Sequence, residues 1–315
     1  MGKTVSRDQP ACWITHPDCE RHDMGGGHPE SPARLQALRQ HLESSGLGVR
    51  LRSVEAPLAA REALLRVHSR DLVEHVLDEP VYGLRRLDAD TAMNEHSAAA
   101  ALRAAGAGLA GLDELLSGRA GFVFCAVRPP GHHAERGRAM GFCLFNSAAV
   151  AVAAALEAGL QRVALLDFDV HYGNGSSAIF RHEPRVRVLN TYQDPLYPYW
   201  QHDAEAHSLI DVPLPPGCRG AAFRAAVEAH WLPALEAFAP ELIVVSAGFD
   251  AHWRDPLAGL DFDDGDYAWI GERIREMADR HCPGRVLALL EGGYDLEGLA
   301  SGVEHFVRAF VEQST

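Results

Sequence analysis

The sequence lacks two features that mark membrane and exported proteins. No apolar stretch is long enough to span a lipid bilayer, and the first residues do not show the charged-then-apolar pattern of a signal peptide. Internal repeats and low-complexity tracts are absent as well. We therefore expect a cytoplasmic protein without a membrane partner. The 315 residues, of which 47% are hydrophobic, provide enough core for one large globular domain or two small ones.

An excess of positive charge is also missing, because the formal net charge is −14. This balance argues against direct binding of nucleic acid, whose phosphates require a basic groove. An acidic surface attracts cationic partners such as lysine-rich peptides or polyamines. Solubility alone explains the same charge without any partner, so both interpretations stay open.

No Cys-x-x-Cys pair occurs among the six cysteines, which are Cys12, Cys19, Cys125, Cys143, Cys218 and Cys282. We interpret them as reduced thiols of the core in a reducing compartment. One closely spaced group near the N-terminus consists of Cys12, His16, Cys19 and His22. Its spacing matches no common structural zinc site, so we do not expect a metal there.

Five apolar runs alternate with helix-like stretches along the chain. The runs are Phe122–Val127, Val163–Leu166, Val186–Leu189, Leu242–Val245 and Val286–Leu290. Their apolarity is continuous, which indicates strands of a parallel sheet that is covered on both faces. The helix-like stretches are Ser97–Leu116, Ser147–Ala158, Ala221–Phe238 and Asp266–Arg280. This alternation predicts a doubly wound α/β fold.

The acidic segment Asp261–Asp266 resembles a calcium-binding loop at first sight. In an EF-hand, glycine occupies the sixth position of the loop, but here Asp266 stands at that position. Acidic residues are favourable at the start of a helix, where they cap free N–H groups and interact with the helix dipole. We therefore expect a helix to begin at Asp264 or Asp266.

Polar loops follow four of the five apolar runs. They carry His132-His133, Asp167–His171, Asp250 and Tyr294. Ligands of open parallel sheets bind beyond the carboxyl ends of the strands. We therefore expect these side chains to share one cleft.

The segment Asp167-Phe168-Asp169-Val170-His171 carries polar side chains at alternate positions, which lie on one face of a strand. Neighbouring buried carboxylates repel each other and need a cation or firm hydrogen-bond partners. Asp169, His171 and Asp250 together form a candidate three-ligand site, whose open positions suit a catalytic zinc. The same ligands suit Fe(II), so the sequence leaves the metal open.

Adjacent histidines after a Pro-Pro-Gly turn indicate a loop that directs His132 and His133 toward the same cleft. A neutral imidazole there can take a proton from an attacking water and return it to a leaving amine. Asp167 and Asn174 are suitable partners to fix the tautomers of these imidazoles. The hydroxyl of Tyr294, which follows two glycines, can donate to a developing oxyanion.

Several motifs in this chain occur in the order that is found in the metal-dependent histone deacetylase family, which the chain resembles. They are Arg128-Pro-Pro-Gly-His-His-Ala134, Gly141-Phe-Cys-Leu-Phe-Asn146, Asp167-Phe-Asp-Val-His171, Gly173-Asn-Gly175, Ala247-Gly-Phe-Asp250 with Asp255-Pro-Leu257, and Glu291-Gly-Gly-Tyr294. Gly27–Arg34 and Gln193–Pro198 are most similar to class II deacetylases and to bacterial acetylpolyamine amidohydrolases. The resemblance extends from about Trp13 to Val307. It implies the arginase–deacetylase fold, a three-layer α/β/α sandwich with a central, mostly parallel sheet, as a single deacetylase domain over residues 1–315. We also expect a homo-oligomer.

The resemblance also implies a role for each matched residue. The implied zinc ligands are Asp169, His171 and Asp250. The implied catalytic residues are His133 as general base and then acid, Asn174 as its orienting partner, His132 with Asp167 as an electrostatic pair, and Tyr294 as the donor to the scissile carbonyl. The implied substrate-binding residues are Phe142 and Tyr197 on the walls of a narrow channel, Gly141 as a backbone acceptor, Arg34 beside an internal path for acetate, and Asp90, Leu257 and Gly293.

Members of this family also bind monovalent cations. The resemblance implies a potassium site at Asp167, Asp169, His171, Asn190 and Thr191, and part of a second one at Phe180, Glu183 and Val186. Asn190 departs from the family, in which serine is more usual at this position. Tyr199-Trp200-Gln201 also departs from it, because relatives often have a glycine-rich turn there, and the bulky side chains would narrow the mouth of the channel.

Three functions are compatible with the sequence. The first is a zinc-dependent amidohydrolase that removes acetyl or other short acyl groups from lysine side chains of peptides or proteins. The second is deacetylation of acetylated polyamines; some relatives with that preference have a carboxylate at the channel entrance, and Leu257 near it favours the first function. The third is a catalytically silent binder of acyl-lysine, against which the retention of His133, Tyr294 and all three metal ligands argues.

Overall fold

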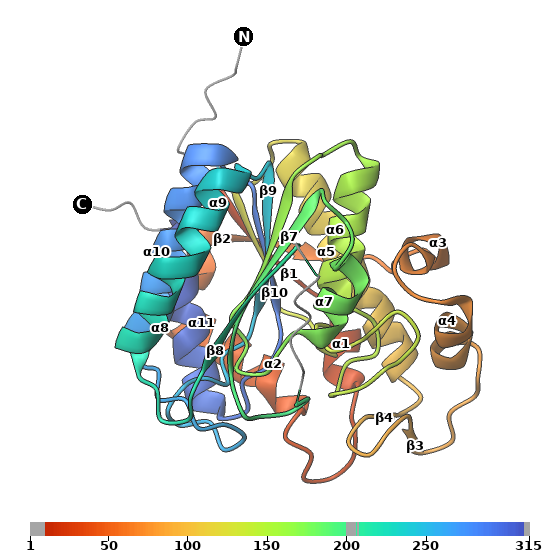
Figure 1. Ribbon diagram of the computed structural model, residues 1–315. Coiled ribbons are helices and arrows are strands. Elements are labelled where there is room, and N and C mark those ends of the chain that lie inside the picture. Colours follow the sequence, from red (N-terminus) through yellow and green to blue (C-terminus); the bar gives the residue numbers. More distant parts are fainter. Residues whose placement is uncertain (1–9, 200–205, 207, 312–315) are drawn as a thin grey trace.

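The protein, described by a computed structural model over residues 10–199, 206 and 208–311, is built on an eight-stranded sheet (Figure 1). The strands of this sheet are β1 (Ala11–Thr15), β2 (Leu51–Glu55), β5 (Phe122–Cys125), β6 (Val163–Asp167), β7 (Val186–Gln193), β8 (Leu209–Leu214), β9 (Leu242–Ala247) and β10 (Val286–Leu290). Their spatial order is β2-β1-β5-β10-β9-β6-β7-β8, and all neighbouring strands run parallel. A separate antiparallel pair is formed by β3 (Arg85–Arg86) and β4 (Ala92–Met93).

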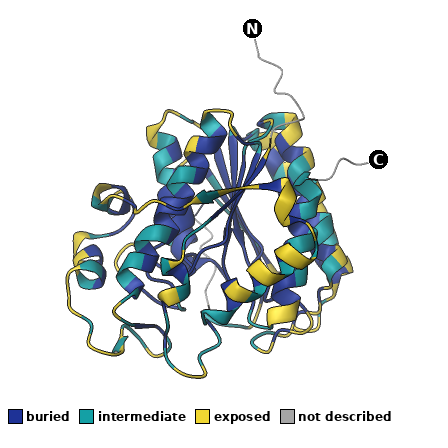
Figure 2. Ribbon diagram, turned by 180° about the vertical axis from the view of Figure 1, so that it is seen from behind, coloured by how far each residue is buried: buried dark blue, intermediate teal, exposed yellow. Residues whose placement is uncertain are grey.

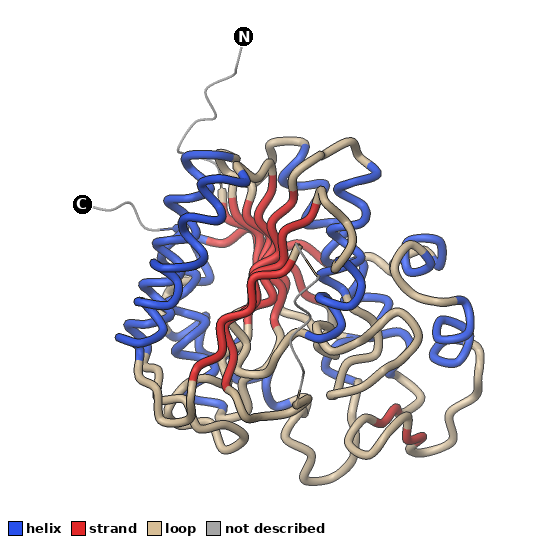
Figure 3. Tube along the Cα trace, in the orientation of Figure 1, coloured by secondary structure: helices blue, strands red, loops and turns tan. Residues whose placement is uncertain are grey.

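Helices cover both faces of the sheet, because parallel strands need crossover connections that pack back onto them. The helical elements are α1 (Asp18–Arg21), α2 (Ala33–Ser44), η1 (Gly48–Arg50), α3 (Arg61–Leu65), α4 (Arg70–Leu77), α5 (Ser97–Leu116), α6 (Ser147–Glu157), α7 (Asn174–Phe180), α8 (Gly220–Ala226), η2 (Val227–Trp231), α9 (Leu232–Phe238), α10 (Asp264–His281) and α11 (Leu296–Val311). One layer contains α8, α9, α10 and α11, with α2 packed on α11, and the other contains α5, α6 and α7 (Figures 1 and 3). The architecture is therefore the expected three-layer α/β/α sandwich.

The central strands are apolar along their whole length because both of their faces are covered. Every residue of β6, β9 and β10 is buried, and these strands appear uniformly dark in Figure 2. Each leucine, isoleucine or valine side chain that is removed from water in this way contributes about 1.5–3 kcal/mol. All five predicted strands are confirmed as β5, β6, β7, β9 and β10.

The predicted helices are also present, with one difference. The stretch expected as one helix over Ala221–Phe238 forms α8, then the five-residue π-helical turn η2, and then α9. The acidic segment before α10 caps a helix as expected, since α10 begins at Asp264. Among the described residues, no helix combines the length and the apolar character that a membrane crossing requires.

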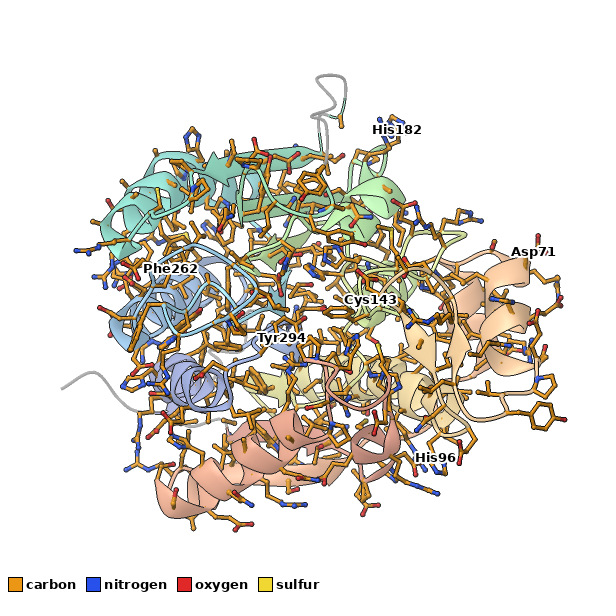
Figure 4. All side chains as sticks on the ribbon, turned by 90° about the horizontal axis from the view of Figure 1, so that it is seen from below. Asp71, His96, Cys143, His182, Phe262 and Tyr294 are labelled. Carbon is orange, nitrogen blue, oxygen red and sulfur yellow. The ribbon has the colours of Figure 1, made fainter. Side chains whose placement is uncertain are left out.

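Four neighbouring strands of the sheet, β5, β10, β9 and β6, are followed by the loops in which we expected the functional side chains. Because these strands are parallel and adjacent, their carboxyl ends lie side by side at one edge of the sheet. Figure 4 views the molecule from this side, and Tyr294 and Cys143 lie near its centre. The topology therefore brings together residues that are far apart in the sequence.

Candidate active site

Three side chains at this edge form a candidate metal site. Asp169 and His171 follow β6, and Asp250 follows the neighbouring strand β9. One ligand atom from each residue lies within 4.8 Å of the other two. Nδ1 of His171 is 3.1 Å from Oδ1 of Asp169 and 3.1 Å from Oδ2 of Asp250. Both carboxylates are buried, with relative exposures of 1% and 0%.

Backbone amides hold the two carboxylates in this orientation. The N–H of Val170 donates to Oδ1 of Asp250 at 2.9 Å, and the N–H of Gly292 donates to Oδ2 of Asp169 at 2.8 Å. The oxygen of each carboxylate that does not accept from these amides is the one that lies beside His171. The site is thus preorganised by its own main chain, as is usual for metal ligands with fixed outer partners.

The electrostatics of these groups favour a bound cation. Burial and the nearby charge of Asp169 raise the pKa of Asp250 to about 7. Burial alone would lower the pKa of His171, but its contacts with Asp169 and Asp250 raise it to about 10. Two adjacent buried carboxylates are stable in their charged form only beside positive charge. Two carboxylates and one imidazole fit zinc, and they fit Fe(II) as well.

The two adjacent histidines in the loop after β5 have different partners. Nδ1 of His132 lies 2.9 Å from Oδ2 of Asp167, whereas Nδ1 of His133 lies 2.7 Å from Oδ1 of Asn174. Their ring centroids are 4.0 Å apart, and the ring of His133 is 5.8 Å from that of His171. Both imidazoles therefore lie next to the candidate metal ligands.

These partners separate the pKa values of the two imidazoles. Burial would lower the pKa of His132, but the carboxylates of Asp169 and Asp167 raise it well above its usual range. For His133, burial and the neighbouring imidazoles of His132 and His171 hold the pKa well below its usual range. These shifts favour the cationic form of His132 and the neutral form of His133, an arrangement that suits acid–base chemistry.

Tyr294 lies in the loop after β10 and is half-buried. Its backbone N–H donates to Oδ2 of Asp255 at 2.6 Å, and the guanidinium of Arg34 lies 5.0 Å from the centre of its ring. Burial raises the pKa of its phenol well above the usual value, so the hydroxyl stays protonated and can donate a hydrogen bond.

The residues expected to line the substrate channel lie around His133 and Tyr294. The ring of Tyr197 contacts that of His133 edge-on at 5.1 Å, and the ring of Phe142 contacts that of Tyr294 edge-on at 5.8 Å. Gly141 has a φ of +56°, and a Cβ at this position would lie 2.4 Å from Cδ2 of His133. Only glycine fits there, and it brings the main chain against the imidazole.

Other residues that we expected to bind the substrate lie farther from the candidate metal ligands. Arg34 is buried behind the loop of Tyr294, where its Nε donates to the carbonyl oxygen of Gly293 at 2.6 Å. The N–H of Leu257 donates to Oδ1 of Asp255 at 3.0 Å, so the loops of Leu257 and Tyr294 share one anchor. Asp90 lines a cavity of about 330 Å³ together with Phe142.

The residues expected to bind potassium lie in and beside β6 and β7. Asn190 and Thr191 are buried in β7, and Nδ2 of Asn190 donates to Oδ1 of Asp211 at 2.8 Å. Phe180, Glu183 and Val186 form the turn between α7 and β7. Trp200 and Gln201, which we expected at the channel mouth, lie outside the described residues, and Tyr199 before them is 73% exposed.

Two buried carboxylates that support the site, Glu291 and Asp255, stand in the family motifs, but we predicted no role for them. Oε2 of Glu291 accepts from the N–H groups of Gly131 and His132, at 2.6 and 3.1 Å, and fixes the histidine loop to the end of β10. Asp255 anchors the Tyr294 loop as described above. Both are acidic residues in loops after apolar strands. Their partners are backbone amides, and the sequence cannot indicate these partners because every residue except proline has a backbone N–H.

Comparisons with known proteins agree with this geometry. A histone deacetylase domain matches residues 28–310. The histone deacetylase-like amidohydrolase of Pseudomonas aeruginosa is 37% identical over 322 residues, which cover 95% of this chain and 83% of that protein. A probable deacetylase of Archaeoglobus fulgidus is 33% identical, and the match covers 90% of this chain and 81% of the relative.

A solved structure is similar over almost the same length. The crystal structure of the HD domain of HDA15 superposes with a TM-score of 0.91 at 30% identity, covering 96% of this chain and 88% of that chain. The similarity therefore extends over nearly the whole chain. On these matches, the chain belongs to the histone deacetylase family, whose members include amidohydrolases and deacetylases.

Proposed function

We propose that this protein is a zinc-dependent deacetylase that hydrolyses the side-chain amide of acetylated lysine in peptides or proteins and releases acetate. The observation that supports this most strongly is the position of His132 and His133, with Nδ1 beside Asp167 and Asn174 respectively, next to a three-residue metal site. One neutral and one cationic imidazole supply a proton acceptor and a fixed positive charge at the same amide.

Zinc held by Asp169, His171 and Asp250 would polarise the amide carbonyl and the attacking water. His133 accepts the water proton at Nε2 while the water oxygen bonds to the carbonyl carbon. It then passes this proton to the lysine nitrogen as the C–N bond breaks. Tyr294 donates a hydrogen bond to the carbonyl oxygen as it becomes negative. The products are acetate and a free lysine amine.

The acyl-lysine side chain would pass between Phe142 and Tyr197, and its amide N–H would donate to the carbonyl of Gly141. Asp90 is the proposed acceptor for the substrate backbone at the rim. Arg34 and Gly293 would line the path by which acetate leaves, and Leu257 would border the channel entrance.

The cavity beside Phe142 favours a peptide over a polyamine. Its lining includes the apolar side chains of Met24, Leu84 and Ala92 and also the polar ones of His28, Arg86 and Asp90. Leu84 is 51% exposed although it is a large apolar side chain. Covering such a surface is favourable for an apolar side chain next to the acetyl-lysine. An acetylated polyamine is a linear chain of amines and methylenes, and it has no apolar branch to place there.

An activity panel on the zinc-loaded protein tests the proposal. The substrates are two acetyl-lysine peptides, which differ only in glycine or leucine next to the acetyl-lysine, and an acetylated polyamine. We expect acetate release from both peptides, with kcat/KM about tenfold higher for the leucine peptide, because burying a leucine side chain stabilises a complex by about 1.5–3 kcal/mol. Faster turnover of the polyamine would favour the second function, and no acetate from any substrate would leave only the silent binder.

A pair of variants tests the contribution of the cavity. Leu84→Ala should reduce the preference for the leucine peptide by about threefold while turnover of the glycine peptide stays unchanged, because part of the apolar wall is lost. Leu58→Ala is the matched control, since Leu58 is 52% exposed but does not line the cavity. An equal change in both variants would contradict the role of the cavity.

Further parts of the proposal concern ions and assembly. Fe(II) is the alternative metal, since the same three ligands suit it. A potassium site at Asp167, Asp169, His171, Asn190 and Thr191 remains a proposal, and Oδ1 of Asn190, which is buried without a hydrogen-bond partner among the described residues, would suit a cation. We also propose that residues 1–315 form a single domain, that the protein is a homo-oligomer and that it is located in the cytoplasm.

A further inference from the structure

The side-chain amide of Asn174 joins the proposed general base to a second acid, Glu135. Its Oδ1 lies 2.7 Å from Nδ1 of His133, and its Nδ2 donates to Oε1 of Glu135 at 2.8 Å. The other neighbours of Nδ2 are the carbonyl oxygen of His133 at 3.4 Å and Sδ of Met140 at 3.5 Å. All three neighbours accept hydrogen bonds and none donates, so the nitrogen of the amide has to face them and the oxygen has to face His133.

This orientation determines which nitrogen of His133 carries the proton. The oxygen of an amide accepts only, so Nδ1 of His133 has to be the donor and Nε2 carries the lone pair. If the amide of Asn174 rotated by half a turn, its NH₂ group would face Nδ1 and favour the other tautomer. An imidazole with its proton on Nε2 cannot accept a proton from water at that atom.

We propose that Glu135 is a positioning residue that sets the tautomer of His133 by holding the amide of Asn174 in one of its two orientations. The inference rests on the proposed function, in which His133 is the general base. A carboxylate at the position of Asn174 would present two equivalent acceptors and would need no such partner. An asparagine presents one acceptor and one donor, so a separate group has to select the orientation.

The main chain around Glu135 is fixed independently of its side chain. Its carbonyl oxygen accepts from Nδ1 of His68 at 2.9 Å, and its N–H donates to the carbonyl oxygen of Arg138 at 2.9 Å. The first turn of α7 packs against Ala134, the residue before Glu135, since a Cβ at Gly175 would lie 2.3 Å from the carbonyl oxygen of Ala134. Glu135 therefore approaches Asn174 from a rigid segment, as the role requires.

The first test measures the steady-state kinetics of variants at position 135. Glu135→Ala should lower kcat on an acetyl-lysine peptide by about tenfold and leave KM within about twofold. Residues that orient metal-bound histidines cost about 10–100-fold in activity when they are removed, and Glu135 orients His133 through Asn174 in a comparable way. Glu135→Gln should recover most of kcat, since its side-chain carbonyl can still accept from Asn174. Glu157→Ala, which removes an exposed glutamate at the end of α6, is the matched surface control.

A double-mutant cycle separates this role from a merely structural one. In the Asn174→Asp background, Glu135→Ala should cause no further loss and can even raise kcat, because both oxygens of the new side chain accept and a like charge is removed. An equal loss in both backgrounds, or no loss in the wild-type background, would overturn the proposal.

A measurement that does not depend on turnover completes the test. The ¹⁵N chemical shifts of His133, assigned with a His133→Ala variant, should show a proton on Nδ1 in the wild-type protein and a shift toward protonated Nε2 in Glu135→Ala. Identical shifts in the two proteins would refute the inference even if the peptide assay were negative. A wild-type protein with the expected tautomer and no activity on any substrate would instead count against the proposed function alone.

Discussion

His132 and His133 are adjacent in the sequence, yet their surroundings give them different charges. His132 faces the carboxylate of Asp167, which stabilises its cationic form, and His133 faces the neutral amide of Asn174. The carboxylates of Asp169 and Asp167 raise the pKa of His132, whereas burial and the imidazoles of His132 and His171 lower that of His133, and this difference separates an electrostatic group from a proton acceptor. At the scale of single residues, the chemistry therefore depends on the partners of the histidines more than on the histidines themselves.

Tyr294→Phe should lower kcat by about 10²–10³-fold on an acetyl-lysine peptide, because the variant loses one donor to the developing oxyanion. Within the described residues, the hydroxyl of Tyr294 has no recorded hydrogen-bond partner, so its removal should leave the stability of the fold unchanged. Zinc content by elemental analysis should also stay the same, since Tyr294 is not one of the three proposed ligands. Tyr82→Phe, at a side chain that is 89% exposed, is the control, and an unchanged kcat in Tyr294→Phe would contradict the proposed role.

The sequence indicates the residues that carry the chemistry better than those that support them. Asp169 and His171 can be predicted because they alternate in one short segment directly after an apolar run. Glu291 cannot be predicted in the same way, since it accepts from the N–H of Gly131, which is 160 positions away in the chain. Glu135 is missed for a related reason, because its contact with Asn174 becomes visible only when α7 packs against the histidine loop.

The start of α10 shows how a local pattern determines an element. The side chain of Asp263 accepts from the N–H of Gly265 at 2.8 Å, and the side chain of Asp266 accepts from the N–H of Asp263 at 3.0 Å. These reciprocal bonds form a capping box and satisfy N–H groups that the helix leaves free. The acidic cluster is thereby explained as a helix start, in agreement with the prediction from its register.

Asp263→Ala should lower the free energy of unfolding by about 1 kcal/mol, because the first turn of α10 loses its cap. Asp263→Ser should retain most of this stability, since its hydroxyl can accept the same hydrogen bond. Urea unfolding, followed by circular dichroism, measures both variants. Because the cap lies away from the proposed site, kcat should not change, and an equal loss of stability in both variants would show that the hydrogen bond is unimportant.

Strands that are covered on both faces could be predicted, whereas those at the edges of the sheet could not. β2 is an edge strand with mostly exposed residues, and β8 forms the other edge and contains Pro213. Edge strands need no continuous apolar run, and they tolerate proline because one side makes no ladder hydrogen bonds. β1 is an exception, because it is buried but was not predicted. Its short apolar run contains only one aliphatic β-branched residue, Ile14, and does not differ clearly from that of a short helix.

At the scale of the whole molecule, the parallel topology is what assembles the site. The loops after β5, β6, β9 and β10 meet because these strands are neighbours in the sheet, although they span positions from about 122 to 290 in the chain. Each loop is further tied to another, as the bonds of Asp169 to Gly292 and of Asp250 to Val170 show. The geometry of the site therefore depends on the stability of the entire fold.

His68 contributes to that stability in a way that depends on pH. It is 1% exposed, its Nδ1 donates to the carbonyl oxygen of Glu135 at 2.9 Å, and its Nε2 accepts from the N–H of Asn146 at 2.9 Å. Burial lowers its pKa from 6.5 to about 4. Between these two pH values the unfolded chain binds a proton at this residue and the folded protein does not, so the contribution is present above pH 6.5 and is lost as the pH falls toward 4.

We expect this loss to amount to about 3 kcal/mol in the free energy of unfolding, because each pKa unit corresponds to about 1.4 kcal/mol. Urea unfolding at pH 7 and at pH 4.5 measures it in the wild-type protein and in His68→Gln. The variant should be less stable at pH 7, yet it should lose less stability on acidification, because position 68 no longer takes up a proton in the unfolded state. His182→Gln removes an exposed imidazole and should keep the wild-type dependence on pH. His68→Gln and the wild-type protein could instead lose the same stability between the two pH values. The acid sensitivity of the fold would then come from other buried groups, and the hydrogen bond between His68 and Glu135 would not contribute to it.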